Sequence, residues 1–262
     1  MSDAPNLRVE LSDNKIATLT LNRPEVHNAF DEGLIEALNA ALEELSGREV
    51  RALVVTGAGK SFSAGADLNY MRRAADASAE ENRAQAAAMA GMMRRLDEFK
   101  SPTLARVKGV SFGGGVGLVA VCDIAIAEAG AQFSLSEVRL GLAPAVVAPY
   151  VIRAIGARAA RRYFLTGERF DAGEAMRIGL VHELAPEGGL DGLRDKLLGE
   201  LVKGGPNAQA AAKRAVERYR DRAIDSALSE DTIDLIAGLR ATDEGREGIT
   251  AFLEKRPPGW RG

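Results

Sequence analysis

The chain has 262 residues, which at about 150 residues per domain suggests one sizeable core with an appendage. Its 34 Lys and Arg residues against 37 Asp and Glu residues leave a net charge of -3, so no cationic field for nucleic acid or for an anionic membrane is expected. Apolar residues make up 46% and charged residues 27%, as in ordinary soluble globular proteins. The N-terminus lacks a cationic and apolar leader, and the longest apolar stretch, 115–127, is too short to span a membrane. We therefore expect a cytoplasmic protein.

The first two hundred residues alternate between strand-like and helix-like patterns. Strands are predicted for one alternating segment and three short apolar runs bounded by Gly, Pro or charge: 16–21, 52–56, 103–107 and 124–127. Helices are predicted for 31–46, with Asp31 as the N-cap and Gly47 at the end, for about 79–98, and from the Gly113–Gly115 cluster to about Val121. This alternation is typical of an α/β fold.

Beyond residue 200 the strand-like runs stop. Three helical patterns follow, at about 207–221, 225–239 and 243–255. We divide the chain into an α/β core, residues 1–200, and a helical region, residues 201–262. Exposed appendages of this size usually pack on a partner subunit.

Several motifs in the chain fail the pattern that their function requires. Residues 57–61 resemble the end of a phosphate-binding P-loop, but Val54 stands where that pattern needs its first glycine. The glycine run at 113–118 ends on Leu118 and therefore lacks the last glycine of a dinucleotide-binding fingerprint. Ser63 does not have the spacing of a nucleophile elbow.

The histidines and the cysteine also argue against other chemistry. His27 and His182 stand alone, without Cys or His at ligand spacing, so we expect no metal site and hydrogen-bonded structural or rim histidines. Cys122 is the only cysteine, and its apolar neighbours predict a buried, unreactive thiol.

Two stretches remain in which small residues expose the backbone next to a helix start, residues 63–67 and 109–115. Missing side chains let a ligand atom approach the peptide N–H groups, and two such groups converging on one oxygen form an oxyanion hole. The alternative is that each stretch is a tight turn before a helix. Glu137 lies downstream among apolar residues, where its pKa would rise toward the range useful for proton transfer. Taken alone, Glu137 could instead be a helix-cap partner of Ser134.

Residues 61–68 (SFSAGADL), 108–123 (KGVSFGGGVGLVAVCD) and 131–141 (AQFSLSEVRLG) together resemble the crotonase, or enoyl-CoA hydratase/isomerase, superfamily. The resemblance extends from Leu7 to the C-terminal 251–258. It implies a spiral of ββα repeats with a C-terminal helical trimerisation region. It also implies trimers that often pair into hexamers, an acyl-CoA thioester substrate, and no cofactor beyond the CoA that the substrate carries.

The resemblance also implies roles for particular residues. Ala66 and Gly114 match the family's two oxyanion N–H donors, and Glu137 matches its second catalytic glutamate. Other residues match positions that contact CoA: Val26, His27, Ala64, Ala66, Asp67 and Leu68 along the CoA arm, and Phe252 and Lys255 at its nucleotide end in related trimers.

Gly117 stands at the position of the family's first catalytic glutamate, and this departure affects the expected reaction. Single-glutamate relatives include enoyl-CoA isomerases, which remain an alternative here. Four segments are most similar in sequence to bacterial methylglutaconyl-CoA hydratases of leucine breakdown: residues 22–30, 66–73, 113–118 and 136–142. These interconvert 3-methylglutaconyl-CoA and 3-hydroxy-3-methylglutaryl-CoA, and one carboxylate suffices chemically for a syn elimination. We expect the space over Gly117 to receive the branched or carboxylated acyl group.

Two further points stay open in the sequence. A distal carboxylate on the substrate would need a cation, for which the candidates are Arg72, Arg73, Arg139 and Arg153. Some relatives with damaged sites bind RNA or act as scaffolds, but the net charge and the complete oxyanion motifs argue against that function here.

Overall fold

The computed structural model describes residues 5–261, and its core is a six-stranded sheet with the strand order β1-β2-β3-β4-β6-β9. The strands β2 to β9 of this sheet are parallel, whereas β1 pairs antiparallel with β2. A second sheet has the order β5-β7-β8. The strands are β1 (Leu7–Leu11), β2 (Ile16–Leu21), β3 (Ala52–Gly57), β4 (Thr103–Val107), β5 (Val110–Phe112), β6 (Ile124–Glu128), β7 (Gln132–Ser134), β8 (Arg169–Asp171) and β9 (Glu183–Ala185).

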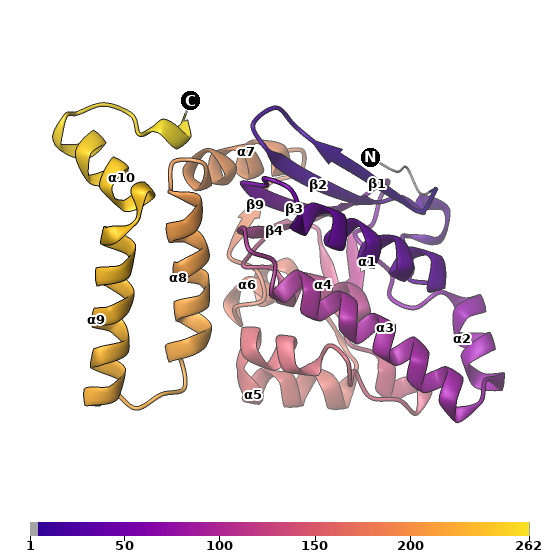
Figure 1. Ribbon diagram of the computed structural model, residues 1–262. Coiled ribbons are helices and arrows are strands. Elements are labelled where there is room, and N and C mark those ends of the chain that lie inside the picture. The colour runs from indigo at the N-terminus through magenta and orange to yellow at the C-terminus, as the bar shows by residue number, and fades with distance from the viewer. Residues whose placement is uncertain (1–4, 262) are drawn as a thin grey trace.

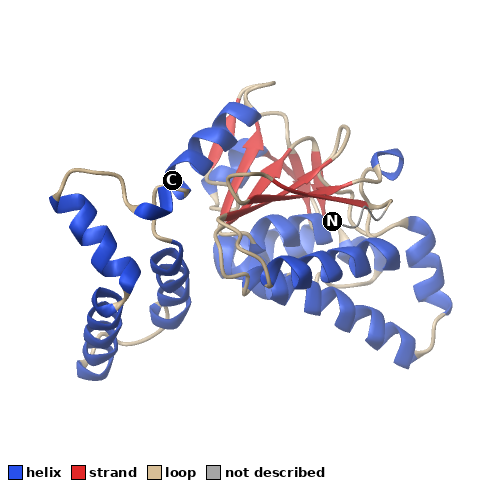
Figure 2. Ribbon diagram, turned by 45° about the horizontal axis from the view of Figure 1, so that its top comes forward, coloured by secondary structure: helices blue, strands red, loops and turns tan. Residues whose placement is uncertain are grey.

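Helices cover both faces of the large sheet (Figure 2). They are α1 (Glu32–Ser46), α2 (Leu68–Asp76), α3 (Ala79–Asp97), α4 (Gly114–Val121), α5 (Ala148–Thr166), α6 (Ala172–Arg177), α7 (Leu190–Leu201), α8 (Pro206–Tyr219), α9 (Ser226–Ala241) and α10 (Asp243–Leu253). Short 3-10 turns lie at Pro24–Val26, Glu137–Leu140 and Gly259–Arg261.

The buried residues of β3 show how the sheet divides the core. Leu53 and Val55 belong to the main hydrophobic cluster, which includes the apolar faces of α1, α3 and α4. Ala52 and Val54, which point to the other face, belong to a smaller cluster with Leu190 and Leu198 of α7. A strand buried on both faces has a continuous apolar run rather than an alternating one, as the sequence 52–56 has.

The structure confirms the predicted strands at 16–21, 52–56, 103–107 and 124–127, with ends that agree within one residue. It also confirms the helix at 31–46, where the Asp31 side chain accepts a hydrogen bond from the Leu34 N–H group, and the helix at 79–98. The sequence prediction missed several shorter elements and α5. Pro149 lies in the first turn of α5, and Gly156 breaks its helical backbone with a φ of +72°, which hides the periodicity.

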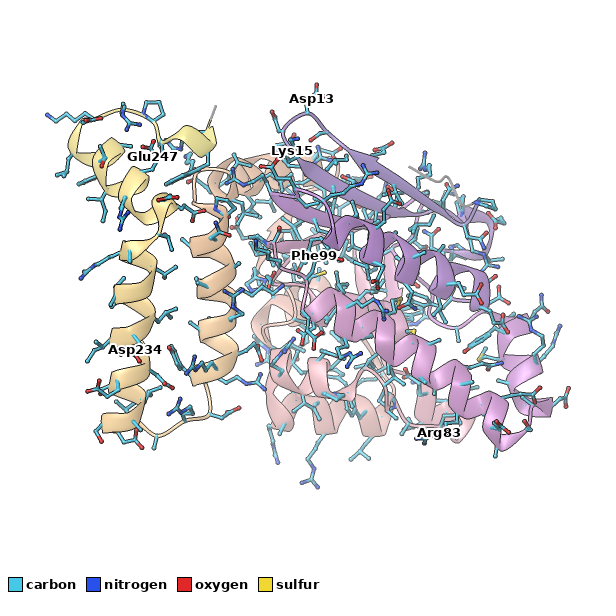
Figure 3. All side chains as sticks on the ribbon, viewed as in Figure 1. Asp13, Lys15, Arg83, Phe99, Asp234 and Glu247 are labelled. Carbon is cyan, nitrogen blue, oxygen red and sulfur yellow. The ribbon has the colours of Figure 1, made fainter. Side chains whose placement is uncertain are left out.

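The predicted C-terminal helices are present as α8, α9 and α10, with boundaries that differ by up to two residues. Helix α8 lies nearest to the core, and α9 and α10 stand away from it (Figure 1). Side chains project from α9 on several sides without cover from the core (Figure 3). The large exposed apolar side chains of this region are Val216, Ile224, Ile233, Ile236, Ile249, Phe252 and Leu253. The division of the chain at residue 200 stays a prediction.

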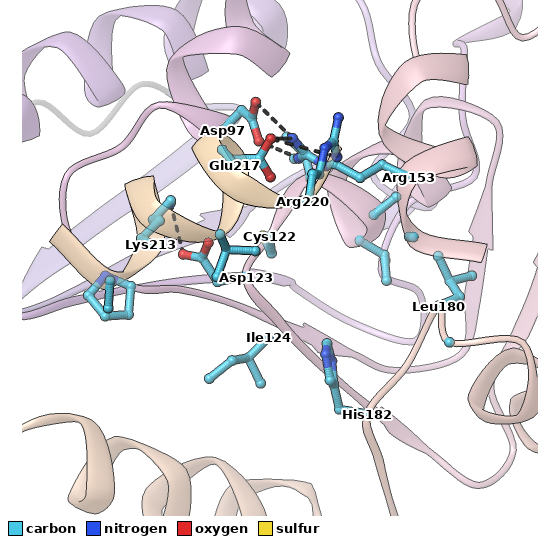
Figure 4. A pocket seen from close by; sticks show the side chains of 18 of the residues that line it. Asp97, Cys122, Asp123, Ile124, Arg153, Leu180, His182, Lys213, Glu217 and Arg220 are labelled. Atoms are coloured by element: carbon cyan, nitrogen blue, oxygen red, sulfur yellow. Dashed lines mark hydrogen bonds and ion pairs between the residues drawn. The ribbon is translucent and has the colours of Figure 1, made fainter. Parts of the chain in front are cut away.

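Ion pairs fix α8 to the core around a cavity of about 650 Å³ (Figure 4). Lys213 of α8 pairs with Asp123 at 2.8 Å. Glu217 of α8 pairs at 3.2 Å with Arg153 of α5, which also pairs with Asp97 of α3. The charges at this cavity are therefore compensated within the chain, and it lies apart from residues 63–67 and 109–115.

Arg51 connects the C-terminal segment to the core. Its side chain is buried, and its guanidinium donates to the carbonyl oxygens of Val202 at 3.1 Å, Gly204 at 2.6 Å and Trp260 at 2.9 Å. One side chain before β3 thus binds both the entry to α8 and the last residues of the chain.

We predict that Arg51→Met loosens the C-terminal segment. Removal of the donor leaves three carbonyl groups without it, and hydrogen bonds from charged groups contribute about 1.5 to 3 kcal/mol each. Limited proteolysis should cut near residues 202–206 faster than in the wild type, with a lower Tm. Arg161→Met, at an exposed position, is the control. Equal cleavage rates for both variants would contradict this role.

Candidate active site

The loop that precedes α2 presents Ala66 to solvent while its neighbours are held in place. The Phe30 N–H group donates to the Gly65 carbonyl oxygen at 2.7 Å, and the Asp67 N–H group donates to the Phe30 carbonyl oxygen at 2.9 Å. Ala66 is exposed, and its N–H group has no acceptor among residues 5–261. The Ala66 N–H group is thus free for a ligand in a loop fixed on both sides.

The second glycine-rich stretch leads from β5 directly into α4. The Gly113 N–H group donates to the Ser134 carbonyl oxygen at 2.8 Å, and Gly113 has a φ of +50°, which a glycine adopts without strain. Gly114 is the first residue of α4, and its N–H group has no acceptor in the described part of the chain, as is usual in the first turn of a helix. Helix N-termini favour negative charge, so this N–H group suits an oxyanion.

The two loops lie against each other. The Phe112 N–H group donates to the Ser63 carbonyl oxygen at 2.9 Å, and the Ser63 N–H group donates to the Val110 carbonyl oxygen at 3.1 Å. A Cβ placed on Gly65 would lie 3.0 Å from the Phe112 carbonyl oxygen. The free N–H groups of Ala66 and Gly114 therefore sit on adjacent backbone segments, as an oxyanion hole requires.

The glycines of this stretch also allow close packing. The alternative that it forms a tight turn before a helix is therefore correct as well, and does not exclude an oxyanion hole. A Cβ on Gly114 would lie 2.8 Å from Cε of Met89, and one on Gly115 would lie 2.8 Å from the Ser63 carbonyl oxygen. The carbonyl oxygen cannot move aside, so Gly115 has no room for a side chain, whereas at Gly114 the end of the flexible Met89 side chain would have to shift. The glycine cluster lets the loops approach and leaves the first N–H groups of α4 open.

Glu137 is the carboxylate next to this turn. It is the first residue of the 3-10 turn Glu137–Leu140, and a Cβ on Gly113 would lie 3.1 Å from its Oε1 atom. Its Oε2 atom is buried without a hydrogen-bond partner in the described residues. Burial raises the pKa of Glu137 above its ordinary value. The Ser134 hydroxyl donates to the Gly167 carbonyl oxygen, so the expectation of a Ser134–Glu137 cap is wrong.

This arrangement places a polarised oxygen and a proton carrier side by side. A carbonyl oxygen held by the N–H groups of Ala66 and Gly114 would have its adjacent carbon made acidic. Glu137, which has a free oxygen and a raised pKa, can take or return a proton near that carbon. The geometry suits proton transfer next to a thioester or another activated carbonyl.

Gly117 lies on the buried face of α4, and the space beside it is filled. A Cβ on Gly117 would lie 2.2 Å from Cγ1 of Val147 and 3.0 Å from Cε of Met93. The expectation that the space over Gly117 receives an acyl group is therefore wrong, because Val147 already occupies it. The sequence analysis missed Val147, because no local pattern brings residue 147 next to Gly117.

Most residues matched to the CoA arm lie near Ala66. The Ala64 N–H group donates to the His27 carbonyl oxygen at 2.9 Å, which brings the Val26–His27 turn beside residues 63–67. Leu68 is 69% exposed at the start of α2 and is available for contact with a ligand. His27 is hydrogen-bonded through Nδ1 to Ser61 Oγ at 2.9 Å. The structure thus groups these residues at one rim, and their contact with CoA stays a prediction.

Asp67, Phe252 and Lys255 differ from this group. The Asp67 carboxylate is buried, accepts hydrogen bonds from the first N–H groups of α2 and pairs with Arg23, so it is engaged within the chain. Phe252 is exposed, and it lies with Lys255 at the end of α10, on the opposite side of the chain from α2 (Figure 1). The structure therefore does not bring Phe252 and Lys255 to Ala66 within one chain.

The four arginine candidates separate by their partners. Arg73 pairs with Glu32, and Arg153 pairs with Asp97 and Glu217. Within residues 5–261, Arg72 and Arg139 have no carboxylate partner, and Arg139 lies two residues after Glu137 in the same turn.

His182 is hydrogen-bonded and Cys122 is buried, as the sequence predicted. His182 accepts a hydrogen bond at Nδ1 from the Ala125 N–H group at 3.0 Å. Cys122 is buried, and burial beside Asp123 raises its pKa to about 12. In the region that the structure describes, there is no group of three or more His, Cys, Asp and Glu side chains that could hold a metal ion. No helix within 5–261 is long and apolar enough to cross a bilayer.

Comparisons with known proteins identify the family of the chain. The family model described as enoyl-CoA hydratase/isomerase matches residues 12–262. The chain is 34% identical over 251 residues to a putative enoyl-CoA hydratase of Thermus thermophilus, covering 95% of this chain and 99% of that protein. It is 33% identical to the 2,3-dehydroadipyl-CoA hydratase of Escherichia coli, covering 95% of this chain and 96% of that protein.

The structure is also similar to solved structures of this class. An enoyl-CoA hydratase from Shewanella pealeana superposes with a TM-score of 0.94 at 42% identity, covering 97% of this chain and 96% of that one. The mixed α/β architecture is thus the crotonase fold that the motifs predicted. The chain belongs to the enoyl-CoA hydratase/isomerase family.

Proposed function

We propose that the chain interconverts 3-methylglutaconyl-CoA and 3-hydroxy-3-methylglutaryl-CoA, with Glu137 as the only acid/base carboxylate. The observation that carries the proposal is the partly buried carboxyl of Glu137 next to the Gly113–Gly114 turn, whose Oε2 atom has no hydrogen-bond partner among residues 5–261, together with the apolar filling beside Gly117. The proposed enzyme needs no cofactor beyond the CoA arm of its substrate.

The first part of the mechanism is electrostatic. The thioester oxygen accepts hydrogen bonds from the N–H groups of Ala66 and Gly114 and carries the negative charge of the enolate as it forms. Donors fixed before the reaction stabilise this charge without a reorganisation cost, and one such donor contributes about 100- to 1000-fold in rate.

The second part is proton transfer by Glu137. In the hydration direction, ionised Glu137 takes a proton from water while the oxygen of that water bonds to Cβ, and the carboxyl then delivers the proton to Cα. In the reverse direction, Glu137 removes the Cα proton and gives it to the departing β-hydroxyl. Both transfers use one face of the substrate, so elimination is syn. A tertiary β-carbon eases departure of the hydroxyl group.

Two observations support a carboxylated acyl group. The related protein from Escherichia coli is named for 2,3-dehydroadipyl-CoA, whose acyl group derives from a dicarboxylic acid. Arg139 lies two residues after Glu137 in the same turn, is exposed and has no carboxylate partner in 5–261, so it is our candidate for the distal carboxylate. An assay of 3-methylglutaconyl-CoA and crotonyl-CoA side by side tests the substrate, and preference for crotonyl-CoA would contradict it.

The second candidate function is isomerisation of a β,γ-enoyl-CoA to its α,β isomer. The same single carboxylate favours it, because an isomerase needs one group to remove and return a proton, and Val147 leaves no polar group beside Gly117. A β,γ-enoyl-CoA in the same assay separates the two functions.

We also propose that the helical region assembles the chain into a homotrimer or a dimer of trimers in the cytoplasm. The exposed apolar side chains of α9 and α10, among them Ile233, Ile236 and Phe252, support this proposal. In such an assembly, Phe252 and Lys255 could reach the CoA of a neighbouring subunit.

We predict that Glu137→Gln loses about 100- to 10000-fold in kcat, because the variant cannot carry the proton. Glutamine has almost the same volume, so the fold and CoA affinity should be kept. Steady-state kinetics and CoA binding check this prediction. Retention of more than about a tenth of the wild-type rate would remove Glu137 from proton transfer.

Although Glu137→Gln should be less active, it should be more stable than the wild type at neutral pH. Because burial raises the pKa of Glu137, the folded state binds more protons than the unfolded state between the ordinary value of 4.5 and the raised value. The free energy of unfolding of the wild type therefore falls as pH rises through this window. Glu137→Gln lacks this loss and should have the higher Tm at neutral pH, but no such advantage below pH 4.5.

Ala66→Pro removes one of the two N–H donors of the proposed oxyanion hole. We expect turnover of every thioester substrate to fall in parallel, by about 100- to 1000-fold, since the hole holds the oxygen that all of them share. Circular dichroism and the oligomer size control for distortion of the loop. A folded variant with unchanged rates would exclude Ala66 from the mechanism.

Gly117 and Val147 should be interpreted as a pair. Gly117→Glu alone should impair activity toward all substrates, because its Cβ would meet Val147 at 2.2 Å. Gly117→Glu with Val147→Gly admits the second carboxylate, and should raise kcat/KM for crotonyl-CoA relative to 3-methylglutaconyl-CoA by at least about 10-fold. Val147→Gly alone is the control. If the double variant leaves the ratio where that control leaves it, Val147 does not decide between the one- and two-carboxylate sites.

A further inference from the structure

A mostly buried arginine outside the proposed active site connects the segments that hold Ala66. Arg23 follows β2, and its side chain is 14% exposed. Its Nη1 atom donates to the Ala29 carbonyl oxygen at 2.6 Å. Its Nη2 atom lies 2.9 Å from Oδ2 of Asp31 and 3.1 Å from Oδ2 of Asp67.

Both carboxylates that pair with Arg23 are helix N-caps. Oδ1 of Asp31 accepts from the Leu34 N–H group at 2.8 Å at the start of α1. Oδ1 of Asp67 accepts from the Asn69 N–H group at 2.8 Å at the start of α2. Each carboxylate thus uses one oxygen for its helix and the other for Arg23. One guanidinium therefore sets the distance between the first turns of α1 and α2.

These contacts surround the free N–H group of Ala66. Asp67 is the next residue in the chain, and Phe30, which forms a β-bridge with Ala66, lies between the two residues on the other segment that Arg23 contacts, Ala29 and Asp31. A shift of Asp67 would rotate the peptide groups on its N-terminal side. Residues 29–31 and 65–67 are thus held in register by the bridge and by Arg23.

We propose that Arg23 is a positioning residue, which acts through Asp67 and Asp31 to aim the Ala66 N–H group at the substrate oxygen. The inference rests on the proposed role of Ala66 in the oxyanion hole. Arginine suits this position because its planar fork donates in several fixed directions at once, whereas a lysine offers one compact charge. The two carboxylates that pair with Arg23, those of Asp31 and Asp67, come from different segments, so their relative position depends on the guanidinium group.

The test compares Arg23→Met and Arg23→Lys with a matched control, Arg106→Met. Arg106 is also mostly buried, at 17% exposure, and pairs with Asp191 at 2.9 Å between β4 and α7. That pair contacts none of residues 29–31 and 65–67. The measurements are kcat and KM for a turned-over enoyl-CoA, Tm, and the absorption spectrum of bound cinnamoyl-CoA. Strong hydrogen bonds to the thioester oxygen move this absorption to longer wavelength.

We expect Arg23→Met to lower kcat by about 10- to 100-fold with a smaller effect on KM, since misplacement by about 1 Å can cost about 100-fold. The cinnamoyl-CoA shift should shrink, and Arg23→Lys should recover part of both. Arg106→Met should lower Tm and keep the shift and kcat. If Arg23→Met lowers only Tm, or lowers kcat while the full shift remains, the proposal is overturned.

A further variant covers the possibility that Arg23→Met fails to fold. Asp67→Asn keeps the N-cap of α2, because asparagine caps helices as well as aspartate does, and it removes one ion pair of Arg23. It should reduce the cinnamoyl-CoA shift and kcat together, and an unchanged shift in this folded variant would also overturn the proposal. Ala66→Pro separates failure of the proposed function from failure of the Arg23 proposal. If this variant keeps the full cinnamoyl-CoA shift, Ala66 is not an oxyanion donor, independently of the results for the Arg23 variants.

Discussion

The close contact between two backbone segments, residues 63–67 and 110–114, is the constraint on which the rest of the site depends. Hydrogen bonds of Ser63 to Val110 and Phe112 hold the segments together, and Gly65 and Gly115 have no room for a side chain where the segments meet. Backbone at this separation can present N–H groups from two loops to one oxygen. The sheet and its covering helices fix the ends of both segments, so the spacing is set before any ligand binds.

The chain tolerates an unfavourable carboxyl next to this contact. Glu137 is partly buried with one oxygen unpartnered, and burial raises its pKa, so ionising it costs folding free energy. A protein selected for stability alone would supply a donor or an apolar residue at this position. Perturbed titratable groups of this kind concentrate at functional sites, and here the same property that destabilises the fold suits proton transfer.

Gly117 and Val147 together occupy, with apolar groups, the position where the resemblance places the family's first catalytic glutamate. The resemblance implies a family carboxylate where this chain has Gly117, and the volume beside Gly117 is taken by the apolar side chain of Val147 at the start of α5. This side chain fills space that would otherwise be a void in the core. The chain's difference from two-glutamate hydratases therefore lies in a pair of positions that are far apart in the sequence.

The sequence by itself determined the strands at 16–21, 52–56, 103–107 and 124–127, the helices α1 and α3, and the family, because periodicity, caps and glycine spacing are local signals. It also identified Glu137 and the stretches 63–67 and 109–115 as candidates from the residues themselves, and Ala66 and Gly114 as the two donors through the resemblance to a family. Tertiary structure alone decided that Val147 fills the space at Gly117, that Asp67 turns inward to Arg23, and that Phe252 lies far from Ala66 in one chain. Each of these depends on contacts between residues distant in sequence, which no local pattern records.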